Sequence, residues 1–300
     1  MSDPRVLRLG LAQADAVLGD VEANLDRACG LIEAAVAQDC HLVVFPELAL
    51  SGLTVADVAL DCALAPDSPI LWELRERSRD ISIAIGYVER GRRGELHNTV
   101  GFFEDGELVH AHRKLYLTTY GDLVEGKAFK AGDQARAFDS RHGRFAIAIC
   151  EDAWHLPVPY MAAMAGAEVL LICAASPRGN TSHEVTSETL WRTVNRSHAV
   201  TLKLFDVFVN RVGVEDPHVF WGGSHVIAPD GRFAYDTDDA AEGLHCAQID
   251  LDELARQRFR FPYLRDERLE MTLRELGRLA DERWAEGPAP AALPEEQMTD

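Results

Sequence analysis

The feature that most constrains the fold is an apolar run, RFAIAIC, at residues 144–150. Phe145, Ile147 and Ile149 alternate with two alanines, and the run stops at Cys150 before two acidic residues. A short apolar run of this kind is typical of a strand buried on both faces, as in the parallel sheets of α/β proteins. A single buried cysteine is more often packing than chemistry, because a free thiol behaves as a small hydrophobic side chain. The other residues of the chain decide whether Cys150 is a packing residue or a reactive one.

Strand-like and helix-like segments follow one another along the chain. Alternating or apolar runs predict strands at 5–13, 41–45, 81–90, 96–104, 107–114, 168–176, 204–210, 225–229, 232–236 and 245–251. Helical spacing predicts helices at 21–38, 68–80, 158–166, from about 183 onward, and at 263–285. Asp105-Gly106, between two alternating runs, is a strong hairpin signal. Both parallel units and hairpins are therefore expected, in a mixed α/β sheet system covered by helices.

Domain organisation is simple, because no repeat or linker-like break interrupts the first 285 residues. We expect one domain over residues 1–285. Residues 286–300, EGPAPAALPEEQMTD, are rich in proline, alanine and acidic residues. We expect this tail to be disordered or to contact a partner.

The charge of the chain limits its partners. Among 300 residues, 49 acidic and 30 basic side chains give a formal net charge of −19. A nucleic-acid-binding surface needs clustered Lys and Arg, and an anionic membrane attracts basic segments, so we expect neither partner. The beginning, MSDPRVLRLG, shows no export signal, and the six cysteines form no CxxC pair. We expect a cytoplasmic protein with reduced thiols.

Three predicted strands end in side chains whose chemistry fits together: Glu47, Lys114 and Cys150. A thiol is mostly protonated near neutral pH and needs a base or a nearby cation to become a nucleophile. Glu47 could take the proton, and Lys114 could stabilise the thiolate and then the oxyanion formed on an attacked carbonyl. Each residue alone has an ordinary structural explanation, but the three together indicate nucleophilic catalysis by Cys150.

The residues around Cys150 also allow other interpretations. Cys150, Asp152 and His155 could be imagined as metal ligands, but their spacing matches no standard zinc pattern, so we expect no metal and no cofactor. The histidines at 97, 110 and 112 lie on the predicted hairpin, where surface or hydrogen-bonding roles are the expectation. Asp152 is a candidate cap for the helix that follows. The side chains of both acidic residues after Cys150 are expected to turn away from the sulfur, because their charge would raise its pKa.

These segments resemble the nitrilase, or carbon–nitrogen hydrolase, superfamily. The resemblance covers roughly residues 5–270 and rests most strongly on three segments that hold Glu47, Lys114 and Cys150: LVVFPELALSG, GELHNTVGFFEDGELVHAHRKLYL and IAICEDAWH. It implies a four-layer α-β-β-α sandwich and a Glu-Lys-Cys triad. It also gives Glu125, in the loop after the lysine, a positioning or proton-handling role.

Further residues are candidates for the pocket. The backbone N–H of Glu151, which follows the nucleophile, is the expected second oxyanion donor. Trp154 is expected to line the pocket as readily as to pack in the core. Tyr120, in the long loop after Lys114, and Ser176, at the end of the segment AEVLLICAAS, are candidate substrate-binding residues.

Within the superfamily, SGLTVADVAL, YGDLVEGKAF and CEDAW resemble the glutaminase domain of glutamine-dependent NAD synthetases. Two features differ from that group: the sequence does not continue into a synthetase domain, and Ala174 stands where an asparagine is common. The resemblance implies a thiol amidase that hydrolyses a small amide with water, and a homodimer or larger homo-oligomer. Nitrile or carbamoyl-amine hydrolysis, a glutaminase subunit feeding a separate synthetase, and a non-catalytic scaffold remain alternatives.

Overall fold

The computed structural model describes residues 5–120, 123–179, 185–237 and 240–285. Contacts within the chain define a compact unit that ends at Leu264 and a second unit that starts at Arg265. In the second unit, the described residues are the end of a short helix, α7 (Tyr263–Asp266), and helix α8 (Leu269–Ala285). The predicted tail, residues 286–300, lies outside the described residues.

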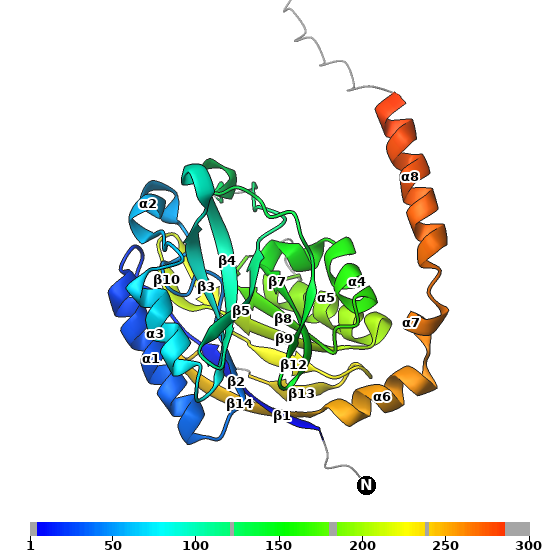
Figure 1. Ribbon diagram of the computed structural model, residues 1–300, viewed down its shortest axis with the longest axis horizontal. Coiled ribbons are helices and arrows are strands. Elements are labelled where there is room, and N and C mark those ends of the chain that lie inside the picture. The colour runs from blue at the N-terminus through cyan, green and yellow to red at the C-terminus, as the bar shows by residue number, and fades with distance from the viewer. Residues whose placement is uncertain (1–4, 121–122, 180–184, 238–239, 286–300) are drawn as a thin grey trace, which may run out of the picture. The chain divides into compact units, whose positions relative to one another are not determined.

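The first sheet has six strands in the order β14-β1-β2-β3-β4-β5 (Figure 1). Their bounds are β1 (Val6–Gln13), β2 (Leu42–Val44), β3 (Ser82–Arg90), β4 (Leu96–Glu104), β5 (Glu107–Arg113) and β14 (Gly243–Asp250). The strands β1, β2 and β3 are parallel, and the others are antiparallel to their neighbours. The connections between the parallel strands contain α1 (Val21–Ala37), α2 (Ala59–Cys62) and α3 (Pro69–Arg77). Asp20 caps α1 by accepting a hydrogen bond from the Ala23 N–H.

The second sheet also has six strands, in the order β13-β12-β9-β8-β7-β6. Their bounds are β6 (Ala137–Ser140), β7 (Gly143–Ile149), β8 (Val169–Ala174), β9 (Phe205–Asn210), β12 (His225–Ile227) and β13 (Phe233–Asp236). The central strands β7, β8 and β9 are parallel and are connected through α4 (Pro157–Met164) and α5 (Ser187–Leu202). The remaining elements of this unit are the hairpin β10 (Val212–Glu215) and β11 (His218–Trp221) and the helix α6 (Leu251–Arg260).

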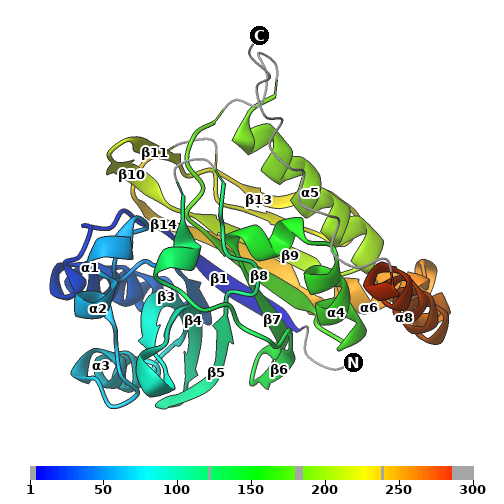
Figure 2. The same cartoon turned by 90° about the horizontal axis from the view of Figure 1, so that it is seen from above.

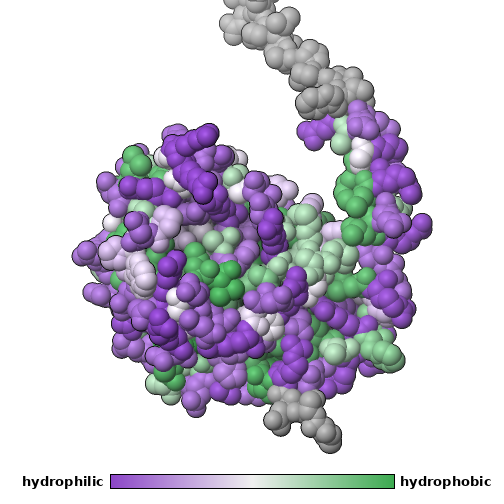
Figure 3. Space-filling model, in the orientation of Figure 1, coloured by the Kyte–Doolittle hydropathy of each residue, from purple (hydrophilic) through white to green (hydrophobic). Residues whose placement is uncertain are grey.

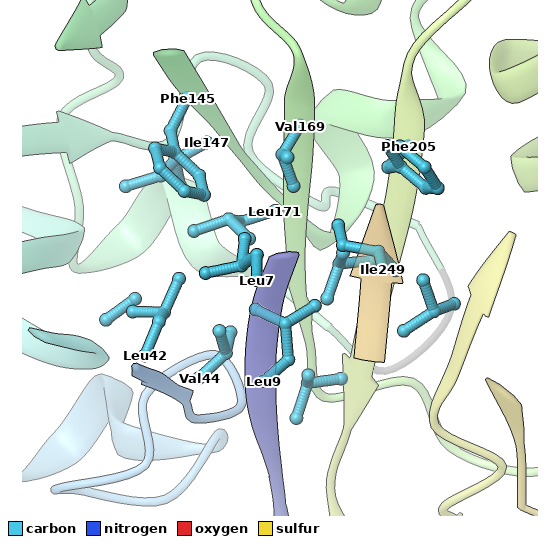
Figure 4. Packing of buried hydrophobic residues seen from close by; sticks show 14 of the residues in the cluster. Leu7, Leu9, Leu42, Val44, Phe145, Ile147, Val169, Leu171, Phe205 and Ile249 are labelled. Carbon is cyan, nitrogen blue, oxygen red and sulfur yellow. The ribbon is translucent and has the colours of Figure 1, made fainter. Parts of the chain in front are cut away.

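The main core lies between the two sheets. Figure 4 shows leucine and valine side chains of β1 and β2 facing side chains of β7, β8 and β9. The large residues of the nucleophile-bearing strand, Phe145, Ile147 and Ile149, all point into this core. Burial of apolar surface between the sheets is therefore what holds the two halves of the molecule together.

The outer faces of the sheets are covered by helices. The small residues Ala146 and Ala148 of β7 pack in a cluster with Val158 of α4 and Trp191 of α5. On the other sheet, residues of α1 and α3 pack against β2 and β3. Figure 2 shows these two pairs of helices on opposite sides of the paired sheets. The predicted α-β-β-α sandwich is confirmed.

Several elements were not predicted. The strand β6 and the hairpin β10–β11 are only four residues long per strand, which is too short for a clear alternating pattern. The helix α6 was also missed, although Asp250 caps it by accepting from the Asp252 N–H. The predicted helix 263–285 is instead two helices, α7 and α8, with a break at residues 267–268.

The surface in the view of Figure 3 is mostly hydrophilic, with hydrophobic residues in separate patches. In the described ranges, no helix has both the length and the apolar character needed to cross a membrane.

We predict that Leu171→Ala, in the middle of β8, lowers the free energy of unfolding by about 2–5 kcal/mol. Leu171 is fully buried between the sheets, so its loss leaves a cavity there. Urea unfolding followed by circular dichroism measures the change. Leu60→Ala is the matched control, because Leu60 is 65% exposed and its truncation should change stability by less than about 0.5 kcal/mol. Equal losses in the two variants would contradict the assignment of the core.

Candidate active site

A cavity of about 330 Å³ opens at the carboxyl ends of β7 and β8. Seven of the eight predicted site residues line it: Glu47, Lys114, Tyr120, Cys150, Glu151, Trp154 and Ser176. The eighth, Glu125, is buried and contacts the Lys114 ammonium group. Two sheets supply these residues, because Glu47 follows β2, Lys114 follows β5 and Cys150 follows β7.

Cys150 occupies a sharp turn between a strand and a helical segment. The strand β7 ends at Ile149, and a 3-10 helix begins at Cys150 and ends at Trp154. Cys150 has a φ of 45°, in the left-handed region that side chains with a Cβ rarely adopt. Such a conformation costs on the order of 1–3 kcal/mol and persists only where the surroundings enforce it. The turn places the thiol at the wall of the cavity instead of in the core.

Lys114 is enclosed by carboxylates. Its Nζ lies 2.7 Å from Glu47 Oε1 and 2.7 Å from Glu125 Oε2, and it donates a hydrogen bond of 3.2 Å to Thr118 Oγ1. The side chain is 1% exposed. Burial disfavours the ammonium form, but the two carboxylates outweigh this effect and hold the pKa of Lys114 above its usual value. Lys114 is therefore a fixed positive charge.

Glu47 accepts hydrogen bonds at both carboxylate oxygens. Oε1 accepts from Asn98 Nδ2 at 2.8 Å as well as from Lys114, and Oε2 accepts from the Ala175 N–H at 3.1 Å. Burial raises the pKa of Glu47, and the nearby Glu125 adds to the increase, while Lys114 and Asn98 oppose it. A carboxyl group with a raised pKa is a better proton acceptor than an ordinary glutamate.

The resting thiol of Cys150 is protonated near neutral pH. Burial raises its pKa well above the usual value, and the charge of Glu47 raises it further. Lys114 and the Ala175 N–H act in the opposite direction. The predicted stabilisation of a thiolate by Lys114 agrees in direction with its effect on the Cys150 pKa, and it remains a prediction.

Asn98 is a site residue that the sequence analysis missed. Its Nδ2 donates to Glu47 Oε1 at 2.8 Å and to Glu125 Oε1 at 3.1 Å, so one amide group joins the two carboxylates. Asn98 lies within β4, where every residue is buried. A polar amide in a buried strand is costly unless it is hydrogen-bonded. An asparagine inside the predicted strand LHNTVGFFE could therefore have indicated that Asn98 has a buried hydrogen-bond partner.

The remaining wall of the cavity combines polar and aromatic groups. The Tyr120 hydroxyl donates to Glu151 Oε2 at 2.6 Å, and burial together with this bond raises the pKa of Tyr120. The ring of Trp154 packs edge-to-face against Trp191, with centroids 4.8 Å apart. Trp191 Nε1 donates to Ser176 Oγ at 2.9 Å. Trp191 was not predicted as a wall residue, and neither was Arg178, which also lines the cavity.

The prediction that Asp152 caps the following helix is wrong. The helix α4 begins at Pro157, and no side chain bonds to its first N–H groups. Asp152 is fully buried, and its carboxylate pairs with His112 Nε2 at 2.9 Å. The prediction of a hydrogen-bonding role for His112 is therefore correct.

His155 stacks on the Tyr116 ring, with centroids 3.5 Å apart. Within the described part of the chain, no group of three or more His, Cys, Asp or Glu could hold a metal ion.

The four-layer sandwich and the acid, base and thiol groups in one cavity define an enzyme of the hydrolase class. The family model described as carbon-nitrogen hydrolase matches residues 8–259, and the chain belongs to this family.

Similar proteins have several activities. The chain is 31% identical over 269 residues to an (R)-stereoselective amidase from a Pseudomonas species, covering 88% of this chain and 92% of the amidase. It is 26% identical over 248 residues to the glutamine-dependent NAD(+) synthetase of Acinetobacter baylyi, covering 82% of this chain and 44% of the synthetase. The chain thus spans less than half the length of that relative.

Solved structures show the same fold. A carbon-nitrogen hydrolase from Helicobacter pylori G27 superposes with a TM-score of 0.79 at 24% identity, over 90% of this chain and 98% of that one. A glutamine-dependent NAD+ synthetase from Acinetobacter baumannii gives a TM-score of 0.74 at 25% identity, over 83% of this chain and 46% of that one.

We predict that iodoacetamide alkylates Cys150 at a rate that rises as the pH increases from 7 to 9, because its thiolate forms only above the usual pKa of a cysteine. The fully buried Cys173 should not react, and the exposed Cys246 serves as an internal reference. Peptide mass spectrometry of timed samples measures each rate. A Cys150 rate that is constant over this range would mean that the thiolate already exists at pH 7.

Proposed function

We propose that the protein is a thiol amidase that hydrolyses a non-peptide C–N bond of a small amide through a thioester on Cys150. One observation carries the proposal: Cys150, Glu47 and Lys114 line the same cavity, in which Lys114 is a fixed charge and Glu47 a buried base. Nucleophile, base and electrostatic stabiliser are the groups that acyl transfer to sulfur requires.

The first step is attack on the amide carbon. Glu47 takes the proton from Cys150 as the sulfur approaches the carbonyl, so a protonated resting thiol is compatible with catalysis. The substrate oxygen gains negative charge, which Lys114 and the backbone N–H of Glu151 stabilise. The Glu151 N–H belongs to the first turn of the 3-10 helix, where N–H groups lack partners within the helix.

The second half of the reaction releases both products. Glu47 returns the proton to the departing nitrogen, the C–N bond breaks, and ammonia or an amine leaves a Cys150 thioester. Water then attacks the thioester carbon while Glu47 accepts its proton. The C–S bond breaks, Glu47 returns the proton to the Cys150 sulfur, and the acid is released. Glu125 serves mainly to hold Lys114, because it contacts the ammonium group but does not line the cavity.

The size of the cavity favours a small substrate. Its volume of about 330 Å³ lies at the low end of ligand sites in general. Trp154 and Trp191 offer apolar surface, whereas Glu151 and Arg178 offer opposite charges. These charges favour a second candidate, a glutaminase subunit that supplies ammonia to a separate synthetase, since an amino-acid amide carries both an ammonium and a carboxylate group. Hydrolysis of nitriles or carbamoyl amines by the same three residues is a further alternative.

We also propose a cytoplasmic homodimer or larger homo-oligomer. The support is exposed apolar surface near the helix after the nucleophile, where Leu156 is 69% and Met161 is 42% exposed. Exposed apolar side chains of this kind are suited to contact between subunits.

We predict that Cys150→Ala abolishes amide turnover and leaves the fold intact, because alanine removes the only attacking atom of the mechanism. Ammonia release measures turnover, and thermal unfolding measures the fold. Cys246→Ser is the control, since Cys246 is exposed and is not among the residues that line the cavity. Undiminished ammonia release by Cys150→Ala would refute the mechanism.

For Glu47→Gln, we expect the rate of ammonia release in the same assay to fall by at least about 100-fold, because the general base is lost.

A substrate panel separates the candidate functions. We expect ammonia release to be fastest with small aliphatic or aromatic amides, and hydroxylamine should divert the thioester to a hydroxamic acid. Preference for nitriles or carbamoyl amines would favour those alternatives. Preference for glutamine, together with co-purification of an NAD synthetase-like partner, would favour the glutaminase subunit. Absence of any adduct or product would revive the scaffold reading.

A further inference from the structure

The carboxylate of Asp152 is shared between two parts of the site. Its Oδ1 accepts hydrogen bonds from the Leu115 and Tyr116 N–H groups, both at 2.9 Å. Its Oδ2 accepts from the Ile149 N–H at 3.0 Å and from His112 Nε2 at 2.9 Å. The side chain is fully buried, so water does not compete for these four bonds.

The bonded backbone groups are the immediate neighbours of the reacting residues. Leu115 directly follows Lys114, and Ile149 directly precedes Cys150. Lys114 belongs to the end of β5 in the first sheet, and Cys150 to the end of β7 in the second. Asp152 therefore connects the ends of two strands that lie in different sheets and share no sheet hydrogen bonds.

His112 completes this arrangement. It lies on β5 two residues before Lys114, and its side chain is also fully buried. The bond from Nε2 to the carboxylate fixes Asp152 from the strand that carries Lys114. A hydrogen bond to a charged buried group is stronger than one between neutral groups.

We propose that Asp152, held by His112, is a positioning residue that sets the distance between the Cys150 sulfur and the Lys114 ammonium group for acyl transfer. This inference rests on the proposed function. Asp152 does not line the cavity, so it acts through its neighbours and not on the substrate.

The strained backbone of Cys150 supports this role. A left-handed cysteine relaxes unless its flanking groups are held. Asp152 holds the N–H of the preceding residue from within the same 3-10 turn. If the turn relaxed, the sulfur would move relative to both Glu47 and Lys114, and a displacement of about 1 Å in an active site can cost about 100-fold in rate.

Asp152→Asn tests the proposal with little change in shape. The amide oxygen can still accept from the two N–H groups after Lys114, but the NH₂ group now faces the Ile149 N–H, which loses its acceptor. We expect kcat to fall about 10- to 100-fold. KM should stay within about threefold, because the cavity wall is unchanged.

A matched pair at His112 covers the case in which Asp152→Asn fails to fold. His112→Gln keeps an N–H donor at about the position of Nε2, whereas His112→Leu removes it. Under the proposal, the glutamine variant retains a much larger share of kcat than the leucine variant. Equal kcat in the two variants would overturn the role of His112 in holding Asp152.

Controls separate positioning from stability. Asp139→Asn, at an aspartate whose side chain is 80% exposed, should leave kcat and thermal unfolding unchanged. All kcat values are referred to the folded fraction measured by circular dichroism. A wild-type kcat for folded Asp152→Asn would overturn the proposal, as would a loss of activity that only follows the loss of folded protein.

The rate of Cys150 alkylation by iodoacetamide separates this inference from the proposed function. If wild-type protein hydrolyses no amide but Asp152→Asn still changes the alkylation rate of Cys150 and not that of Cys246, the positioning role stands and the amidase proposal fails. If amides are hydrolysed and neither kcat nor alkylation responds to Asp152→Asn, the positioning role fails alone.

Discussion

The burial of one ammonium group between two carboxylates is the interaction on which the site depends. Lys114 contacts Glu47 and Glu125 at the same distance, 2.7 Å, in a region without solvent. Removing Lys114 would leave its carboxylate partners buried without a cation, which proteins rarely tolerate. Burial raises the pKa of Cys150, the charge of Glu47 raises it further, and Lys114 opposes the increase. The proposed mechanism therefore transfers the proton of the thiol to Glu47 during attack.

The two-sheet architecture makes this burial possible. Each sheet alone has an exposed edge and two faces to cover, but pairing the sheets buries their inner faces and brings unrelated strand ends together. β2 and β5 of one sheet and β7 of the other each end at the cavity. The apolar core between the sheets is therefore also the support that keeps three chemically different side chains around one cavity.

Buried hydrogen bonds adjust the site more finely than the core can. Asn98 joins the two carboxylates, and Asp152 joins the segments beside Lys114 and Cys150. Neither of these residues has to touch a substrate. Their buried hydrogen bonds restrict the relative motion of the groups that do, which is what a reaction between closely placed atoms requires. The outer wall, with Glu151, Arg178 and two tryptophans, is left to select the substrate.

The sequence by itself determined most strands and helices of a mixed α/β fold, and it placed the candidate reacting groups at strand ends. Alternating runs specify strands, because the side-chain period of two sorts large residues such as Phe145 inward and Ala146 outward. A carboxylate, an ammonium group and a thiol at strand ends are recognisable because their burial demands partners. Only the tertiary structure decided which partners they have. Asn98 bonds to carboxylates that are 27 and 51 residues away in the sequence. The long-range bonds of Asp152 reach groups that are 36 to 40 residues away. No local sequence pattern encodes contacts between residues so far apart.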